Sequence, residues 1–316
     1  MKLIIVGNGF DCAQRENITN YKEKFDTSYK NFGKYLKTKE SGLIDLLNTI
    51  CEEYDANEDE YWYQFEERLG NPDLANLQDD LDIERDFIKR MYDVYDDDSA
   101  TETVEWSQVE GFRKIKYHFC KWLKEREQNL KQLHNEGYVN KLILMNSFVD
   151  EDIFLNFNYT NTIELIYGLC NVYHIHGDIE ECNRISEASN NSDIVLGHKY
   201  KKSTLRKSFY EDVNNSIKRI EKEYSELFDK NCDDIIEEDK TSFFSLLDEE
   251  KNNIEEVYVL GHSIEDVDID YFSKIIEVLG DDVKWIVSDF KGDSLAKKER
   301  LLKINSNLKI DDCIIE

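Results

Sequence analysis

The chain has 316 residues, of which 40% are hydrophobic and 12% aromatic, which is enough for the core of one large domain or two ordinary ones. Its 68 acidic and 40 basic side chains give a formal charge of −28, which argues against binding to nucleic-acid backbones or anionic membrane surfaces. No apolar run is long enough to span a membrane. The seven cysteines form no Cys-x-x-Cys pair, so we expect a cytoplasmic protein with reduced thiols.

The first half of the chain predicts one strand and then a long helical region. Residues 2–6 are a short apolar run, typical of a buried parallel strand, and residues 7–11, GNGFD, are expected to form a turn. From about Tyr21 to Met145 apolar residues recur three and four apart, as in helices. Within this region, residues 45–98 hold 19 acids and four bases. A solvated helical face is the favoured interpretation, and an acidic surface that binds a partner is the alternative.

After residue 150, short apolar strands alternate with helices. We expect strands at 153–159, 171–177, 194–198, 256–263, 282–289 and 308–315, and helices over 201–252 and about 268–279. This alternation predicts an α/β fold with a mostly parallel, Rossmann-like sheet. Residues 1–14 and 146–316 would form a nucleotide-binding core, and residues 15–145 a large helical insertion, or cap, after the first strand.

Polar motifs follow five of these predicted strands, at the end where open α/β sheets bind ligands. They are GNGFD (7–11), NFNYT (156–160), HIHG (174–177), LGH (196–198) and LGHS (260–263). The first is an incomplete dinucleotide fingerprint, because Cys12 stands at the third glycine position of G-x-G-x-x-G. A loop that contacts a nucleotide is favoured over a plain turn between strand and helix.

Three of these motifs suggest catalytic groups. His176 lies at a strand tip and is a candidate general base, because neutral imidazole accepts a proton near pH 7. His174 lies on the same face of the strand and is more typical of a core histidine, although His-x-His can also begin a metal site. Asn158 can fix a sugar or a water, or can cap the next helix. Asp11 is a candidate proton or hydrogen-bond acceptor.

In order along the chain, these motifs resemble the AbiH family of phage abortive-infection proteins. The resemblance rests on GNGFD, Trp62 with Phe65-Glu66, FNYT (157–160), HIHG, and GHS (261–263) followed by DYF (270–272). Family members usually continue after GNGFD with a stretch like Leu-Ala-His-Gly-Leu, where this chain has Cys-Ala-Gln-Arg-Glu at 12–16.

The family is in turn distantly similar to sirtuin-like NAD-binding folds, which carry comparable motifs in the same order. Gly7-Asn8-Gly9, Asn158-Tyr159-Thr160 and His176-Gly177 carry this similarity, with Thr160 where an aspartate is usual. The resemblance implies NAD as ligand or substrate. The expected catalytic residues are His176, Asn158 and Asp11. The expected nucleotide-binding residues are Gly7, Asn8, Gly9, Phe10, Tyr159, Gly177, Gly261, His262, Ser263 and Asp268.

Three functions are therefore open. The first is an anti-phage effector that hydrolyses the nicotinamide–ribose bond of NAD, triggered by a phage or host protein. The second is a sensor or toxin that binds a nucleotide without turnover and acts through a protein partner. Whichever function holds, a homo-oligomer or a defence-system partner is also expected. The third is a metal-dependent hydrolase or nuclease. It would use His174, His176, His198 and His262, with a basic patch at Lys199, Lys201, Lys202, Arg206 and Lys207.

Overall fold

The computed structural model describes residues 1–51, 62, 64–92, 99–184, 194–289 and 292–315, which fall into two compact units. The sheet unit comprises Met1–Ser28, Lys121–Asn183 and Cys232–Glu316. The helical unit comprises Tyr29–Cys120 and Arg184–Asn231. Each unit therefore combines segments that lie far apart in the sequence.

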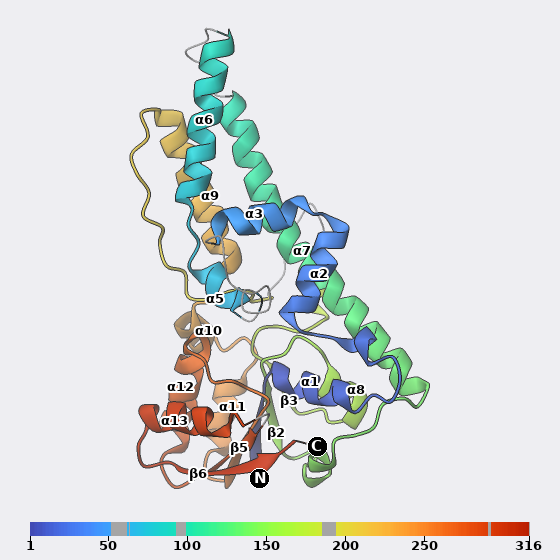
Figure 1. The fold of residues 1–316 in the computed structure, drawn as a ribbon. Coiled ribbons are helices and arrows are strands. Elements are labelled where there is room, and N and C mark those ends of the chain that lie inside the picture. The colour runs from blue at the N-terminus through green and yellow to red at the C-terminus, as the bar shows by residue number, and fades with distance from the viewer. Residues whose placement is uncertain (52–61, 63, 93–98, 185–193, 290–291, 316) are drawn as a thin grey trace. The chain divides into compact units, whose positions relative to one another are not determined.

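The sheet unit is built around six parallel strands in the order β3-β2-β1-β4-β5-β6 (Figure 1). The strands are β1 (Lys2–Val6), β2 (Ile153–Asn156), β3 (Val172–His174), β4 (Glu256–Leu260), β5 (Lys284–Asp289) and β6 (Lys309–Ile314). At the end of β1, Val6 is in register with Asn156 of β2 and Leu260 of β4. The predicted parallel, Rossmann-like α/β fold is confirmed.

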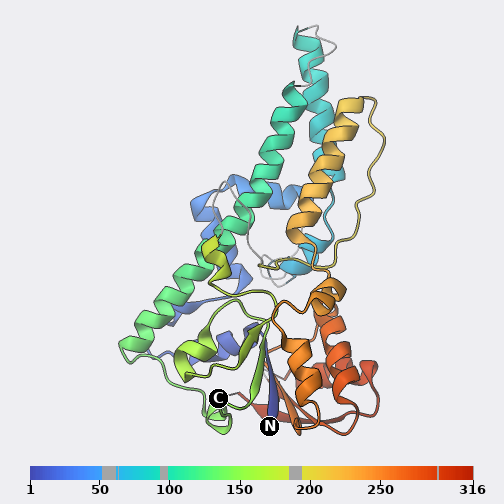
Figure 2. The same ribbon diagram turned by 180° about the vertical axis from the view of Figure 1, so that it is seen from behind.

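Helices cover both faces of this sheet (Figure 2). They are α1 (Asn8–Glu16), α8 (Thr162–Tyr167), α10 (Cys232–Glu238), α11 (Phe243–Glu250), α12 (Ile269–Leu279) and α13 (Ser294–Ile304), with the 3₁₀ helices η1 (Lys22–Phe25), η2 (Ile143–Ser147), η3 (Glu181–Arg184) and η4 (Asp266–Asp268). Side chains alternate along β1, so Leu3 and Ile5 share a core with α10 to α13. Ile4 and Val6 point to the opposite face and share a core with α1, α8 and η2.

The helical unit has an aromatic core of its own. It contains α2 (Tyr29–Lys39), α3 (Gly42–Ile50), α5 (Phe65–Gly70), α6 (Ala75–Tyr92), α9 (Glu211–Phe228) and the first part of α7 (Ser99–Asn135), whose residues from Lys121 onward belong to the sheet unit. The ring of Phe32 lies 5.9 Å from that of Phe65 and 5.3 Å from that of Phe119. Gly33 packs so closely on Trp62 that an added Cβ would lie 2.2 Å from the indole. The helices predicted between about Tyr21 and Met145 are thus confirmed for the described residues of that range.

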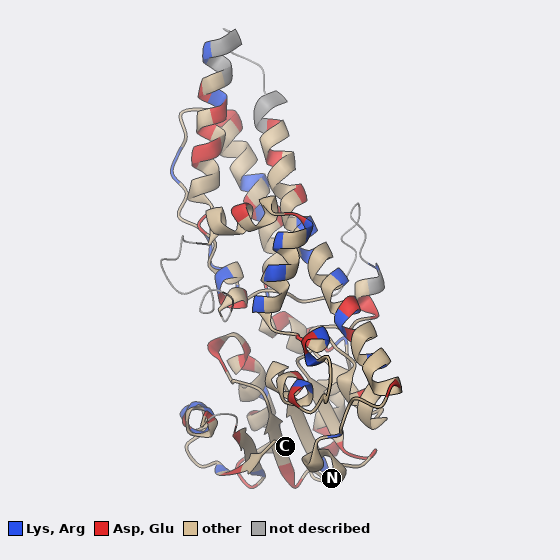
Figure 3. Cartoon of the chain, turned by 45° about the vertical axis from the view of Figure 1, so that its right-hand side comes forward, with Lys and Arg blue, Asp and Glu red and all other residues tan. Residues whose placement is uncertain are grey.

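The acidic stretch at 45–98 lies only partly within the described residues, which leave out 52–61, 63 and 93–98. In its described part, Lys and Arg positions lie among the Asp and Glu positions along the helices (Figure 3). Arg85 of α6, for example, forms an ion pair with Asp212 of α9 at 3.0 Å.

Three local predictions are wrong. Residues 7–11 are not a free turn, because α1 begins at Asn8, directly after Gly7. Residues 194–198 do not form a strand: Ile194 and Leu196 are buried, but only an isolated bridge joins His198 to Asp229. Residues 201–210 are not helical either, and the first helix of that region begins at Glu211.

The two units also differ from the expected division at residues 14 and 146. Residues 15–28 and 121–145 belong to the sheet unit. Backbone hydrogen bonds join these two segments to each other, from the Thr19 N–H to the Tyr138 carbonyl at 2.9 Å and from the Asn140 N–H to the Asn17 carbonyl at 3.1 Å. Residues 184–231 belong with the helical unit instead of the core, since α9 packs on α6. Within the described ranges, no helix combines the length and the apolar character that crossing a membrane requires.

Candidate functional site

The strand order places β1 and β4 side by side at the point where the winding of the sheet changes direction. In doubly wound folds with this order, the crevice outside the carboxyl ends of these strands is the usual dinucleotide site. The motifs after β1, β2, β3 and β4 all lie at this edge, in the sheet unit. All thirteen residues expected to act in catalysis or nucleotide binding therefore belong to one unit and follow neighbouring strands.

Glycines bring the turns after β1 and β4 into direct contact. The Gly9 N–H donates to the Gly261 carbonyl oxygen at 2.8 Å. The Phe10 N–H donates to the Gly7 carbonyl oxygen, also at 2.8 Å. Gly261 has a φ of +65°, and an added Cβ would lie 2.0 Å from the Phe10 nitrogen. The glycines are thus required for close packing, and the N–H groups of Gly9 and Phe10, in the segment expected to contact a nucleotide, are already bonded within the protein.

Asn158 connects the tips of three strands. Its Nδ2 donates to the Gly7 carbonyl after β1 at 3.1 Å. Its own N–H donates to the Asn156 side chain of β2 at 3.0 Å, and its carbonyl lies 2.8 Å from Nδ1 of His174 in β3. The side chain that could fix a sugar therefore also holds the β1 and β2 tips together.

His174 is the centre of a buried ionic network. Because the Asn158 carbonyl can only accept, Nδ1 of His174 carries a proton. Its Nε2 lies 2.9 Å from Oε1 of Glu164 in α8. Burial lowers the pKa of His174, but the bond to Glu164, the charge of that carboxylate and the Asn158 carbonyl together raise it above the ordinary value. We therefore assign His174 as an imidazolium paired with Glu164.

Two further carboxyl groups face this network. Burial raises the pKa of Asp11 to about 6, although hydrogen bonds from Thr160 and Thr162 oppose the shift. The Thr160 hydroxyl donates to Oδ2 of Asp11 at 2.6 Å, while Oδ1 has no hydrogen-bond partner among the described residues. Burial likewise raises the pKa of Glu127, on α7, to about 7. This edge of the sheet therefore holds groups that titrate near neutrality.

His176 lies in a second cluster, beside Asp268 and His262. The Ile264 N–H donates to Nδ1 of His262 at 2.9 Å, so neutral His262 carries its proton on Nε2, which lies 3.3 Å from Oδ2 of Asp268. Nε2 of His176 lies 3.9 Å from Oδ1 of the same carboxylate. Asp268 thus lies between the two imidazoles, with one carboxylate oxygen toward each of them.

Aromatic rings enclose this second cluster. The Phe157 ring lies 4.4 Å from that of His262 and 5.2 Å from that of His176. Tyr271 and Phe272, from the DYF motif, approach the same histidines at 5.7 and 5.1 Å. The carboxylate and the two imidazoles are therefore largely buried among aromatic rings, which strengthens the electrostatic interactions among them.

The remaining expected residues lie around these two clusters. Asn8 is exposed, and its Oδ1 accepts a hydrogen bond from Thr27 at 2.9 Å. Tyr159 is buried, with its ring 6.4 Å from that of His176. Gly177 follows His176 with a φ of +81°. The Ser263 carbonyl accepts a hydrogen bond from Arg300 at 2.6 Å.

Of the four histidines in the predicted motifs, His198 lies elsewhere, because it belongs to the helical unit. In the part of the chain that the structure describes, no group of three or more His, Cys, Asp or Glu side chains could hold a metal ion. The predicted basic patch is partly neutralised, since Arg206 pairs with Asp79 and Asp82, and Lys202 with Glu221 at 3.6 Å. These observations do not favour the metal-dependent hydrolase.

The site expected from the sequence omits Glu127 and Arg300. Glu127 accepts a hydrogen bond from the Asn161 N–H at 2.9 Å, across 34 residues of chain. Arg300 lies on α13, beyond the last motif. No local spacing signals either contact.

Comparison with known proteins agrees with the order of the motifs. The model of the family described as bacteriophage abortive infection AbiH matches residues 3–289, which include β1 from its second residue, β2 to β5 and every expected site residue. Neither the curated proteins nor the solved structures contain a significant match. The match covers most of the chain, and the chain therefore belongs to the AbiH family of bacteriophage abortive-infection proteins.

Proposed function

We propose that this protein binds NAD or a related dinucleotide across the tips of β1 and β4 and hydrolyses its nicotinamide–ribose bond as an anti-phage response. The observation that carries the proposal is the strand order, which brings the motifs after four strands to the usual dinucleotide-binding edge. The His176–Asp268–His262 cluster at that edge adds groups suited to proton transfer.

In this mechanism His176 is the general base. The oxygen of a water attacks C1′ of the nicotinamide ribose while the bond from C1′ to the ring nitrogen breaks. The electron pair of that bond leaves with nicotinamide, which becomes neutral, and the water proton passes to His176. The products are nicotinamide, ADP-ribose and one proton. Asp268, 3.9 Å from Nε2 of His176, stabilises the imidazolium that forms.

Asn158 and Asp11 act by positioning in this proposal. Asn158 holds the β1 turn through its bond to the Gly7 carbonyl. Asp11 holds the β2 tip through Thr160 and contributes negative charge beside His174. Their loss would displace the strand tips that surround the dinucleotide.

The test is release of nicotinamide from NAD by the purified protein, followed by chromatography. His176→Ala is expected to lower the rate about 10²–10⁴-fold, the usual contribution of a general base. His198→Ala is the matched control, because His198 ends a similar motif but belongs to the other unit. Equal activity of His176→Ala and wild type would refute the assignment of the base.

The same measurement is repeated in cells, with NAD followed after phage challenge, so that an absent trigger does not mask the activity. Phage protection with unchanged NAD would refute the hydrolase. Calorimetry with NAD then separates the remaining alternatives: binding without turnover would support a nucleotide sensor that acts through a protein partner.

A further inference from the structure

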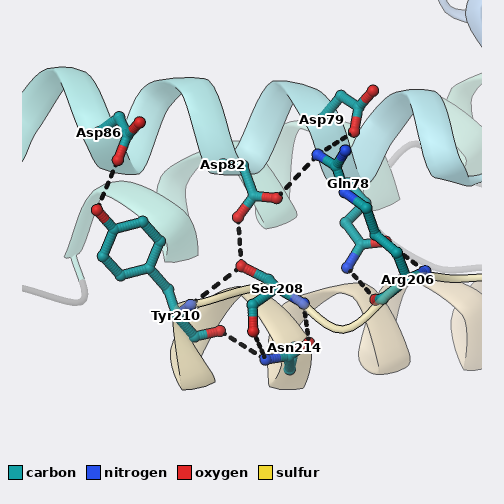
Figure 4. A network of polar contacts seen from close by, with 8 residues as sticks. All are labelled: Gln78, Asp79, Asp82, Asp86, Arg206, Ser208, Tyr210 and Asn214. Carbon is teal, nitrogen blue, oxygen red and sulfur yellow. Dashed lines mark hydrogen bonds and ion pairs between the residues drawn. The ribbon is translucent and has the colours of Figure 1, made fainter.

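Residues 201–210 of the helical unit form an extended strap that is held by one face of α6 (Figure 4). Gln78 exchanges two hydrogen bonds with the backbone of Arg206, at 2.7 and 3.2 Å. One turn further along α6, Asp82 accepts a hydrogen bond from the Ser208 hydroxyl. After another turn, Asp86 accepts one from the Tyr210 hydroxyl at 2.5 Å. Positions four apart on the helix thus bind positions two apart on the strap.

This spacing fixes which side chains of the strap point away from α6. Four helical residues rise about 6 Å and two extended residues about 6.6 Å, so the two repeats stay in register. Ser208, between its bonding neighbours, is buried, whereas Lys207 and Phe209 are exposed. Phe209 is 91% exposed, although its backbone is held on both sides. The strap therefore presents a fixed aromatic side chain to solvent.

A hollow of about 400 Å³ lies beside Phe209. Its walls are Asp82 and Asp86 of α6 and residues 206–210 of the strap. The hollow thus has two carboxylates on one wall and two cations, Arg206 and Lys207, on the other. Arg206 is paired with Asp79 and Asp82, but Lys207 forms no ion pair with any residue in the described ranges.

Apolar side chains extend this surface along α6. Ile83 and Phe87 each follow a strap-binding aspartate by one position, about 100° further round the helix. They are 66% and 53% exposed. The helical unit thus carries an exposed aromatic side chain with a cation beside it and a hollow lined in part by carboxylates, and the same stretch of α6 carries two exposed apolar residues. Complementary features on the same face are what a two-fold contact requires.

We propose that a second copy of this chain binds here, with Phe209 of each copy entering the hollow of the other. Lys207 of each copy then faces Asp82 and Asp86 of its partner, which can each accept further hydrogen bonds. Aromatic anchors in such pockets commonly dominate the affinity of an interface. Because the whole chain carries a charge of −28, two copies approach most easily through a face on which cations offset carboxylates. The proposal does not depend on nucleotide binding.

The test is sedimentation velocity of the full chain from about 1 to about 100 μM, without added nucleotide, since self-association depends on concentration. Wild type is expected to form a dimer, and Phe209→Ser and Lys207→Glu are each expected to weaken it at least about tenfold. Ile143→Ser is the matched control, because Ile143 is 73% exposed but lies on η2 of the sheet unit. Circular dichroism confirms that each variant is folded.

Two results would overturn the proposal. One is a wild-type chain that stays monomeric over the whole range. The other is a dimer that Phe209→Ser leaves intact. If the wild type is monomeric and Phe209→Ser still abolishes phage protection, the strap binds a different protein, and self-association is refuted.

Discussion

Replacing Asp11 by asparagine removes a buried charge and preserves the acceptor for the Thr160 hydroxyl. Burial raises the pKa of Asp11 from 3.8 to about 6, so the folded state binds this proton more tightly than the unfolded state does. Wild-type stability therefore falls as pH rises from about 4 to about 6, and the full penalty is present above that window. A shift from 3.8 to about 6 corresponds to about 3 kcal/mol.

The variant is therefore expected to be more stable than wild type by about 3 kcal/mol at pH 8 but by roughly half as much at pH 5, where wild-type Asp11 is mostly protonated in the folded protein. Urea unfolding at the two pH values measures the difference, and Asp150→Asn, at an exposed position, is the control. An advantage of the Asp11 variant that is the same at both pH values, or larger at pH 5, would refute the reasoning.

Two further predictions concern the turn after β4. Gly261→Ala is expected to destabilise the sheet unit by more than about 3 kcal/mol. Gly168→Ala, at a left-handed position with a φ of +74° but no atom within 4 Å of an added Cβ, is expected to cost about 1–2 kcal/mol, and equal thermal midpoints would contradict this. Arg300→Lys is expected to cost about 1–3 kcal/mol, because one ammonium cannot reach both the Ser263 carbonyl and Glu265, which the guanidinium contacts at 2.6 and 2.8 Å. A thermal midpoint equal to that of wild type would show that the two Arg300 contacts do not contribute to stability.

The sheet could be predicted from the sequence because buried parallel strands are short apolar runs. Residues 194–198 are an apolar run of this kind that does not form a strand. Ile194 and Leu196 are as buried as strand residues, but they pack within the helical unit and have no neighbouring strand. An apolar run predicts burial, and only tertiary contacts decide whether the buried segment joins a sheet.

The strap shows that a sequence compatible with a helix need not form one. Its charged residues predict a helix, but residues 201–210 are extended. In the structure, backbone groups of Arg206 bond to the side chain of Gln78, 128 residues away, in place of the hydrogen bonds of a helix. Propensity alone cannot predict an extended segment that depends on a partner so distant in the sequence.

The candidate site was more predictable than its internal contacts. Strand tips of a parallel sheet share one edge, so the motifs after β1 to β4 had to meet there. The sequence could not show that His174 bonds to Glu164 while His176 lies beside Asp268. Both histidines lie on one strand tip, and only the packed helices determine which carboxylate each one meets.

Contacts from the last helix, α13, also shape the candidate site, although this helix lies beyond the part of the chain that matches the family. The match ends at residue 289, whereas α13 begins at Ser294. Arg300 on this helix holds the turn after β4, and Lys297, buried on the same helix, donates to the Ser288 carbonyl of β5 at 2.8 Å. The Ser288 hydroxyl accepts a hydrogen bond from the Gly261 N–H at 2.9 Å. The glycine turn that packs against β1 therefore depends on residues outside the matched region, and the geometry of this edge cannot be explained from the family motifs alone.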